Sequence, residues 1–158
     1  MPTQKRRLSA LLLPGALLAI AMGVAGSAHA ALGEGIDSLQ RDRQALHGAA
    51  DAVTSLQAYD VHETATLDGT RVREYVTRGG TIFGVAWNGR ARPDLSVLLG
   101  AHYADYLHAA SVNHYNHKLL VINGEGFVMQ SIKLPRGFAG SAHLPALLPA
   151  GTSAAEVR

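Results

Sequence analysis

The chain contains no cysteine among its 158 residues. This absence excludes disulfide bonds, thiolate metal sites, a catalytic thiol and an acylated lipoprotein cysteine. The sequence also lacks a Gly-x-Ser-x-Gly nucleophile elbow, a phosphate-binding loop and a dinucleotide fingerprint. The common hydrolase, kinase and dehydrogenase motifs are therefore missing, and the stability of the domain must come from packing.

The first thirty residues have the pattern of a secretory signal peptide. A basic stretch, Lys5–Arg7, precedes the apolar run Leu8–Ala25, and the small-x-small site Ala28–Ala30 follows. A run of about 18 apolar residues is also long enough for a membrane anchor. Pro14 and several glycines interrupt this one, so we predict cleavage near Ala30 and a periplasmic or secreted location.

Removal of residues 1–30 would change the charge balance of the chain. Three of its 14 Lys and Arg residues lie in that segment, which leaves 11 basic against 12 acidic residues. The remaining 128 residues suffice for one domain. With no excess positive charge, we expect no nucleic-acid binding, and no stable membrane anchor after cleavage.

Three short strands are predicted in the middle of the chain: Tyr59–Leu67, Thr70–Arg78 and Thr81–Asn88. Asp68-Gly69 and Gly79-Gly80 separate them, and both dipeptides are typical of two-residue hairpin turns. The pattern therefore predicts an antiparallel three-stranded meander.

The other predicted elements complete a two-layer α+β domain over residues 31–158. Helical spacing of apolar residues predicts a helix over Ala31–Leu56, and Pro93-Asp94 opens a second helix. Leu119–Ile122 and Phe127–Leu134 form a C-terminal hairpin with apolar residues on both faces. From about Pro135 the tail is expected to be irregular. The predicted fold is an antiparallel sheet, a meander plus a hairpin, covered by two helices.

Taken as two-residue turns, the hairpins place Glu63 opposite Glu74 on an apolar face. Opposed side chains have Cβ atoms about 5 Å apart, so one carboxyl pKa should be raised. One interpretation is a structural cluster of Glu63, Glu74 and His102, with Arg43, Tyr103 or Tyr106 as further partners. The same three residues could instead bind a metal. A third hypothesis is a glycan hydrolase with paired glutamates.

Two further groups of side chains are candidates for binding. His114 and His117 have a spacing that suits zinc or copper if that segment is helical, although its Asn and Ser content favours solvated loop histidines. The polar face of the meander carries Arg71, Arg73, Tyr75 and His62, which could bind an anion or a glycan. A plain solvated sheet face has the same composition.

Several segments resemble a bacterial exported family called domain of unknown function 2844. They share with it these motifs, in order: Ala31-Leu32-Gly33, Val61-His62-Glu63, Val72-Arg73-Glu74-Tyr75-Val76, Ile82-Phe83-Gly84-Val85-Ala86-Trp87, Pro93-Asp94-Leu95 and Leu144-Pro145-Ala146-Leu147-Leu148-Pro149-Ala150-Gly151. The region from His108 to Leu134 matches poorly. The resemblance implies export and an intact fold, and it implies no activity or catalytic residue.

From the sequence we expect a non-enzymatic periplasmic or secreted accessory protein that binds a component of the cell envelope. The hairpin over residues 119–134 and the Pro-rich tail are the expected contact surfaces, toward an envelope protein or a second copy of the chain. A periplasmic zinc or copper protein is the alternative, and the glycan hydrolase is the third hypothesis. No cofactor is predicted for the leading function.

Overall fold

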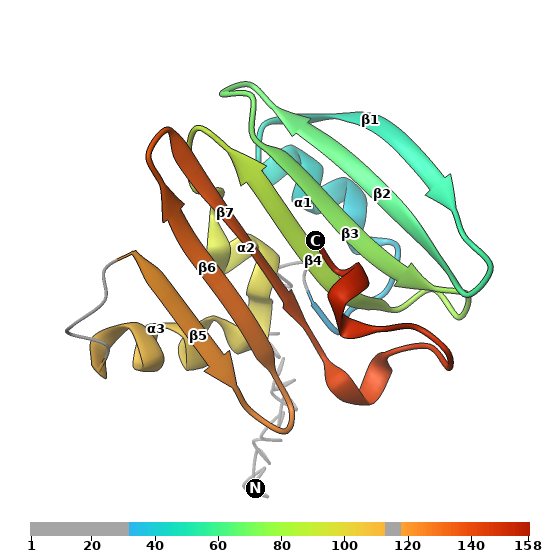
Figure 1. The fold of residues 1–158 in the computed structure, drawn as a ribbon. Helices are drawn as coiled ribbons and strands as arrows, with labels where there is room; N and C mark the ends of the chain where they lie inside the picture. Colours follow the sequence, from blue (N-terminus) through green and yellow to red (C-terminus); the bar gives the residue numbers. More distant parts are fainter. Residues whose placement is uncertain (1–31, 113–117) are drawn as a thin grey trace, which may run out of the picture.

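The computed structural model describes residues 32–112 and 118–158, and the predicted signal peptide lies outside them. The described residues form one seven-stranded antiparallel sheet in the order β1-β2-β3-β4-β7-β6-β5 (Figure 1). The strands are β1 (Gly48–Ser55), β2 (Tyr59–Thr66), β3 (Arg71–Thr77), β4 (Ile82–Gly89), β5 (Leu119–Asn123), β6 (Val128–Leu134) and β7 (Gly137–His143).

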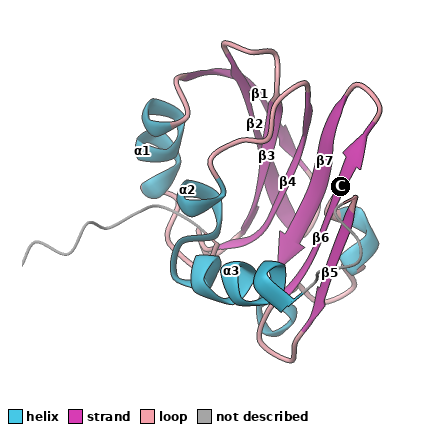
Figure 2. Ribbon diagram, turned by 90° about the vertical axis from the view of Figure 1, so that its left-hand side faces the viewer, coloured by secondary structure: helices cyan, strands magenta, loops and turns pink. Residues whose placement is uncertain are grey.

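All the α-helices of the described residues lie on one side of the sheet (Figure 2). They are α1 (Ser38–Ala45), α2 (Leu95–Leu99) and α3 (Tyr103–Val112), and the 3-10 turn Gly100–His102 joins the last two. The predicted start of the second helical region is confirmed, because the Asp94 carboxylate accepts a hydrogen bond from Ser96 N at 2.9 Å.

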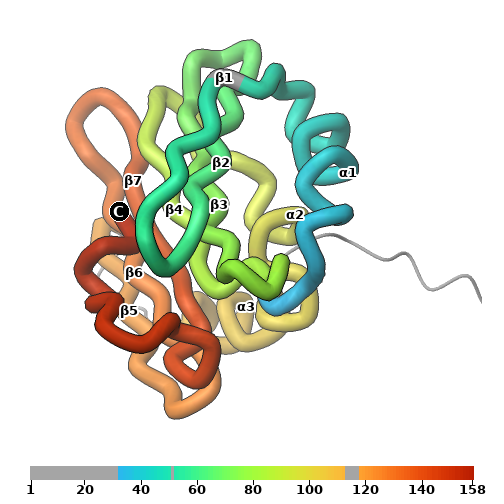
Figure 3. Tube along the Cα trace, turned by 90° about the vertical axis from the view of Figure 1, so that its right-hand side faces the viewer, coloured from blue at the N-terminus to red at the C-terminus, as the bar shows by residue number. Residues whose placement is uncertain are grey.

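The sheet divides the apolar core into two parts. We call the side under α1, α2 and α3 the helix face, and its core includes Val72, Val85, Leu98 and Met129. The opposite side, the open face, has a smaller core where the C-terminal tail crosses β2, β3 and β4 (Figure 3). Its buried members are Tyr59, Tyr75, Phe83, Ala86 and Val157. The open face of β5, β6 and β7 lies beyond that tail.

The predicted helix over residues 31–56 is wrong in its second half. The helix ends at Ala45, and His47 takes a left-handed φ of 50° that turns the chain back. Gly48–Ser55 then pairs with β2 as an edge strand. Val53, expected to be buried on the helix, is largely exposed.

The predicted irregular tail is also wrong in its first part. Gly137–His143 forms β7, which pairs with β4 on one side and β6 on the other. It joins the meander and the C-terminal hairpin into a single sheet. The α+β class, the antiparallel sheet and the two helical regions are confirmed. The sheet is larger than predicted, because it also contains β1 and β7.

The C-terminal hairpin has the two apolar sides that the sequence predicts. Met129 is buried in the core of the helix face, and Ile122 packs against that core. Leu119, Val121 and Ile132 are partly exposed. These three residues therefore leave an apolar surface beside the polar centre of the open face.

Candidate functional site

The predicted pairing of Glu63 with Glu74 is wrong by one residue. Thr66 N donates to Thr70 O at 2.9 Å, and Gly69 N donates to Thr66 O at 3.0 Å, so three residues form the turn. Glu63 consequently pairs with Arg73. A shift of one residue moves a side chain to the other face of a strand. The two glutamates therefore lie on opposite faces of the sheet.

The register of the second hairpin agrees with the prediction over most of its length. Glu74 pairs with Val85, and Val72 pairs with Trp87, as expected. A bulge beside the turn then pairs Val76 with Ile82 rather than with Phe83. The side of the sheet assigned to Glu74 was therefore right, and the side assigned to Glu63 was wrong.

On the open face, Glu63 is held by two arginines. Its carboxylate oxygens each accept one hydrogen bond at 2.8 Å, from Arg71 Nη1 and from Arg73 Nε. The hydrogen bond that Arg73 donates to Glu63 raises the pKa of Arg73. This arrangement satisfies Glu63 as an anion, so it is a poor general acid.

The same network fixes the C-terminal residue. Arg73 Nη1 donates to Arg158 O at 2.6 Å, and the Tyr75 hydroxyl donates to the same oxygen at 2.7 Å. The amide of Arg158 donates back to the Tyr75 hydroxyl at 3.0 Å. Arg71, Arg73 and Tyr75 thus share one face as predicted. His62 does not, because it pairs with Glu74, whose side chain lies on the helix face.

On the helix face, Glu74 meets an acid that the sequence did not single out, Asp42 of α1. Both side chains are about 99 % buried. Burial, followed by the hydrogen bond and the charge of Asp42, raises the pKa of Glu74 well above its ordinary value. Burial also raises the pKa of Asp42, to about 6. Carboxylate oxygens only accept hydrogen bonds, so their bond requires a proton on one carboxyl group.

The surroundings of this carboxyl pair are polar but incompletely hydrogen-bonded. Both oxygens of Asp42 and Glu74 Oε1 have no partner other than such a proton, and Ser38 Oγ on α1 and Thr64 Oγ1 on β2 are buried without a hydrogen-bond partner. Buried polar groups without partners cost stability. The polar layer between α1 and the sheet is therefore a point where the core is weak.

His102 does not join either glutamate. It stacks on Phe127, with 4.9 Å between ring centroids, and its Nδ1 lies 3.3 Å from Asp105 Oδ2. Phe127 precedes β6, and β4 and β7 separate β6 from β3, which carries Glu74. The predicted cluster of Glu63, Glu74 and His102 is therefore not formed, as a polar network or as a metal site.

The described residues contain no group of three or more His, Asp or Glu side chains placed to hold a metal ion. His114 and His117 lie outside the described residues, so the second predicted metal site stays a prediction. The separation of the two glutamates also removes the geometry on which the glycan-hydrolase hypothesis depended.

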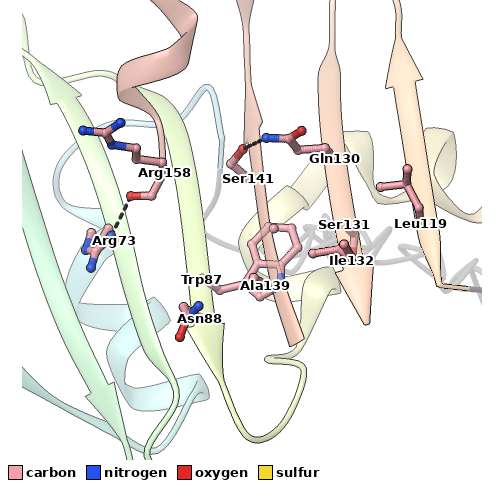
Figure 4. Close-up of a pocket in the computed structure, with 11 residues that line it drawn as sticks. Arg73, Trp87, Asn88, Leu119, Gln130, Ser131, Ile132, Ala139, Ser141 and Arg158 are labelled. Atoms are coloured by element: carbon pink, nitrogen blue, oxygen red, sulfur yellow. Dashed lines mark hydrogen bonds between the residues drawn. The ribbon is translucent and has the colours of Figure 1, made fainter. Parts of the chain in front are cut away.

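The open face carries a hollow of about 370 Å³ over β4, β7, β6 and β5 (Figure 4). Arg73 and Arg158 stand at one end, and Leu119 and Ile132 at the other. Between them lie the polar side chains of Asn88, Gln130 and Ser141, where Gln130 Nε2 donates to Ser141 Oγ at 3.4 Å. This surface offers hydrogen-bonding groups and apolar contacts to a ligand, without a nucleophile–base pair.

A second hollow, of about 600 Å³, lies at the end of the same strands and shares Asn88 with the first. Three arginines line it: Arg71 at the start of β3, Arg90 after β4 and Arg136 in the β6–β7 turn. We call it the arginine hollow. The sequence analysis found only Arg71 in this group, because β7 was missing from the predicted sheet.

A comparison with protein-family models matches residues 28–157 to a family described as "Protein of unknown function (DUF2844)". The chain belongs to the DUF2844 family. No curated protein and no solved structure matches the chain. The family resemblance inferred from the sequence is thereby confirmed. The match includes both the carboxyl pair and the two hollows of this DUF2844 protein.

None of the helices in the described part of the DUF2844 chain is long and apolar enough to cross a membrane. Two features of the described residues remain as functional candidates, one buried and one accessible. The Asp42–Glu74 pair is closed to solvent and bears on stability. The open face and its hollows are accessible and bear on binding.

Proposed function

We propose that this DUF2844 protein is an exported, non-enzymatic binding protein of the cell envelope, and that its ligand lies on the open face of the sheet. The observation that carries the proposal is the hollow of about 370 Å³ over β4, β7, β6 and β5. The N-terminal signal pattern supports export.

The composition of the hollow supports binding rather than catalysis. Ligand sites combine apolar walls with a few polar groups that orient the ligand. Here Leu119 and Ile132 supply apolar contacts, and Asn88, Gln130 and Ser141 supply neutral hydrogen-bonding groups. Glu63, a carboxylate near this end, is engaged by two arginines.

The test is a map of the ligand-binding surface by NMR. The protein would be expressed with its signal segment in isotope-labelled medium and recovered in its exported form from the periplasm. Muropeptides, purified envelope polysaccharides and detergent-solubilised envelope proteins from the same cells would then be titrated separately. We expect saturable shifts at Asn88, Gln130 and Ser141 with one of these fractions.

Variants distinguish the open face from the rest of the surface. Gln130→Ala removes an exposed side chain of the hollow, and Gln40→Ala removes an exposed glutamine of α1 as the matched control. Weaker binding for Gln130→Ala alone would support the proposal. Chemical-shift changes confined to residues of the helix face, or no chemical-shift change with any fraction, would overturn the proposal.

A further inference from the structure

We infer that the arginine hollow makes this protein a receptor for an acidic glycan, a sugar chain that carries carboxylate or phosphate groups. The inference rests on the proposed function, because it takes the open face as the binding face. It adds the chemical class of the ligand and names the residues that select it: Arg71, Arg90 and Arg136.

The position of the hollow follows from the sheet order. Arg71 pairs with Asn88 at the ends of β3 and β4, and Leu134 pairs with Gly137 across the β6–β7 turn. The backbones of β4 and β7 approach closely here, since a Cβ on Gly137 would lie 2.1 Å from Gly89 O. Three arginines distant in sequence are therefore brought around one cavity of about 600 Å³.

The positive charge of this hollow is not neutralised from within. No acidic residue lines it. In the described part of the chain, no carboxylate lies within ion-pair distance of Arg90 or Arg136, and both side chains are exposed. Arg71 is bound to Glu63 through Nη1, but its side chain is 58 % exposed.

The nearest acid along the chain, Asp68, is held in the β2–β3 turn. Its Oδ1 accepts hydrogen bonds from Thr66 Oγ1 at 2.5 Å and from Thr70 N at 2.9 Å. These bonds lower the pKa of Asp68 and keep its charge in the turn. An anion entering the hollow therefore meets at least two arginines without a competing partner.

Arginine recognises carboxylate and phosphate groups through paired hydrogen bonds, which gives the hollow its preference for anions. Asn88 lines both cavities, so it connects the arginine hollow to the hollow of about 370 Å³ that contains Gln130 and Ser141. Amide and hydroxyl side chains suit the hydroxyl groups of sugars. A continuous path with cations at one end and neutral polar groups beyond fits a glycan with acidic substituents.

The experiment measures binding of defined oligosaccharides by calorimetry to the exported protein purified from the periplasm. Tetragalacturonate supplies carboxylates, a phosphorylated tetrasaccharide supplies phosphates, and maltotetraose is the neutral probe. We expect binding of one acidic probe, at least tenfold weaker binding of maltotetraose, and a loss of affinity as salt is raised from 0.05 to 0.5 M, in line with about an 8–10 Å screening length at intermediate salt.

Single variants Arg90→Gln and Arg136→Gln each remove one cation from the hollow. We expect each to weaken acidic binding by about tenfold, the usual worth of a hydrogen bond to a charged group. Arg41→Gln on α1 is the control, because it removes the same charge from an exposed arginine on the helix side. It should leave the affinity unchanged.

The outcomes separate this inference from the proposed function. If Gln130→Ala weakens binding of a neutral glycan and the arginine variants do not, the open face binds but the acidic class is wrong. If Arg41→Gln lowers the affinity for the acidic probe as much as Arg90→Gln and Arg136→Gln do, the affinity depends on net charge alone, and the inference is overturned. Equally tight binding of tetraglutamate would assign the hollow to acidic peptides instead.

Discussion

Asp42 and Glu74 make the stability of this protein depend on pH. Both pKa values are raised above their ordinary values, 3.8 for Asp42 and 4.5 for Glu74, chiefly because burial disfavours the charged forms. The folded chain therefore holds these protons more tightly than the unfolded chain. The contribution of Asp42 to stability is complete below about pH 4 and is lost as the pH rises through 6, and the contribution of Glu74 is likewise lost as the pH rises above its ordinary pKa of 4.5.

The substitution Glu74→Gln should remove much of this loss. A glutamine can donate to Asp42 at every pH, so the variant should gain on the order of 2 kcal/mol over the native chain at pH 8. The measurement is urea unfolding from pH 4 to 8. Glu63→Gln is the control, since it breaks the hydrogen bonds to Arg71 and Arg73 and should lower stability at neutral pH.

Other groups act in different parts of the pH range. Burial lowers the pKa values of His62 and His143, so their contribution is lost as the pH falls below 6.5. The lowered pKa values of Asp60 and Glu156 matter only below about pH 4. Comparison of Glu74→Gln with the native chain cancels these effects. Parallel stability curves for the two proteins would contradict the prediction.

Gly140 is one of the residues where an added methyl group should be costly. Its Cβ would lie 2.2 Å from Trp87 Cζ2 and 2.6 Å from Gln130 O, so neither the ring nor the backbone can avoid it easily. We expect Gly140→Ala to lower the free energy of unfolding by about 3 kcal/mol. Gly126→Ala is the control, because nothing lies within 4 Å of its Cβ. Chemical denaturation of both variants at one pH tests the difference.

At this scale the sequence predicted the chemistry of Glu74 but not its partner. The period-2 pattern correctly gave Glu74 an inward side chain, and a raised pKa followed from burial. The partner could not be found, because Asp42 belongs to α1 and only the packing of that helix on the sheet brings it to Glu74 of β3. The side of Glu63 depended on one turn residue, Leu67, which belongs to the turn and not to β2.

At the scale of elements, the last turn of the chain secures the smaller core. Val157 is buried and packs over Gly84, where a Cβ would lie 2.9 Å from Val157 Cγ1. The Ser153 capping box, with Glu156 Oε1 accepting from Ser153 N at 2.8 Å, holds the preceding 3-10 turn. The tail thus closes one half of the open face and leaves the other half accessible.

Shortening this valine should loosen the tail. Val157→Ala removes two buried methyl groups, and we expect a loss of about 2 kcal/mol in thermal or urea unfolding. Val53→Ala, in the exposed position of an edge strand, is the matched control and should change stability by less than about 0.5 kcal/mol. Equal effects of the two substitutions would show that the tail contributes little to the folded core.

The elements that the sequence missed have weak strand signals of their own. β1 is rich in alanine, and its residues also satisfy a helical spacing. β7 contains two glycines and small side chains, and its place is set by pairing with β4 and β6 rather than by its own propensity. The meander and the hairpin, with regular alternation and turn residues, were predicted because their signals are local.

At the scale of the whole molecule, the sheet separates the main apolar core from the accessible surface that we propose for binding. The helix face buries the main core, and the open face keeps exposed arginines and a hollow next to the tail. β7 is the element that makes this division, because it places the meander arginines beside the β6–β7 turn. Without that central strand the sequence could indicate a face that binds an anion, but not the cavity that gives this face its shape.

Export should determine which form of the protein presents this surface, the precursor or the chain without its signal segment. We expect signal cleavage after Ala30, so that the mature chain begins at Ala31 and contains 128 residues. Mass spectrometry of protein from the periplasm and the medium would show this form. Ala30→Leu should block cleavage and retain the precursor at the membrane, whereas Ala49→Leu, in a partly exposed strand outside the signal, should not. A full-length chain in the soluble cytoplasm would contradict export and, with it, the assignment of the ligand to the envelope.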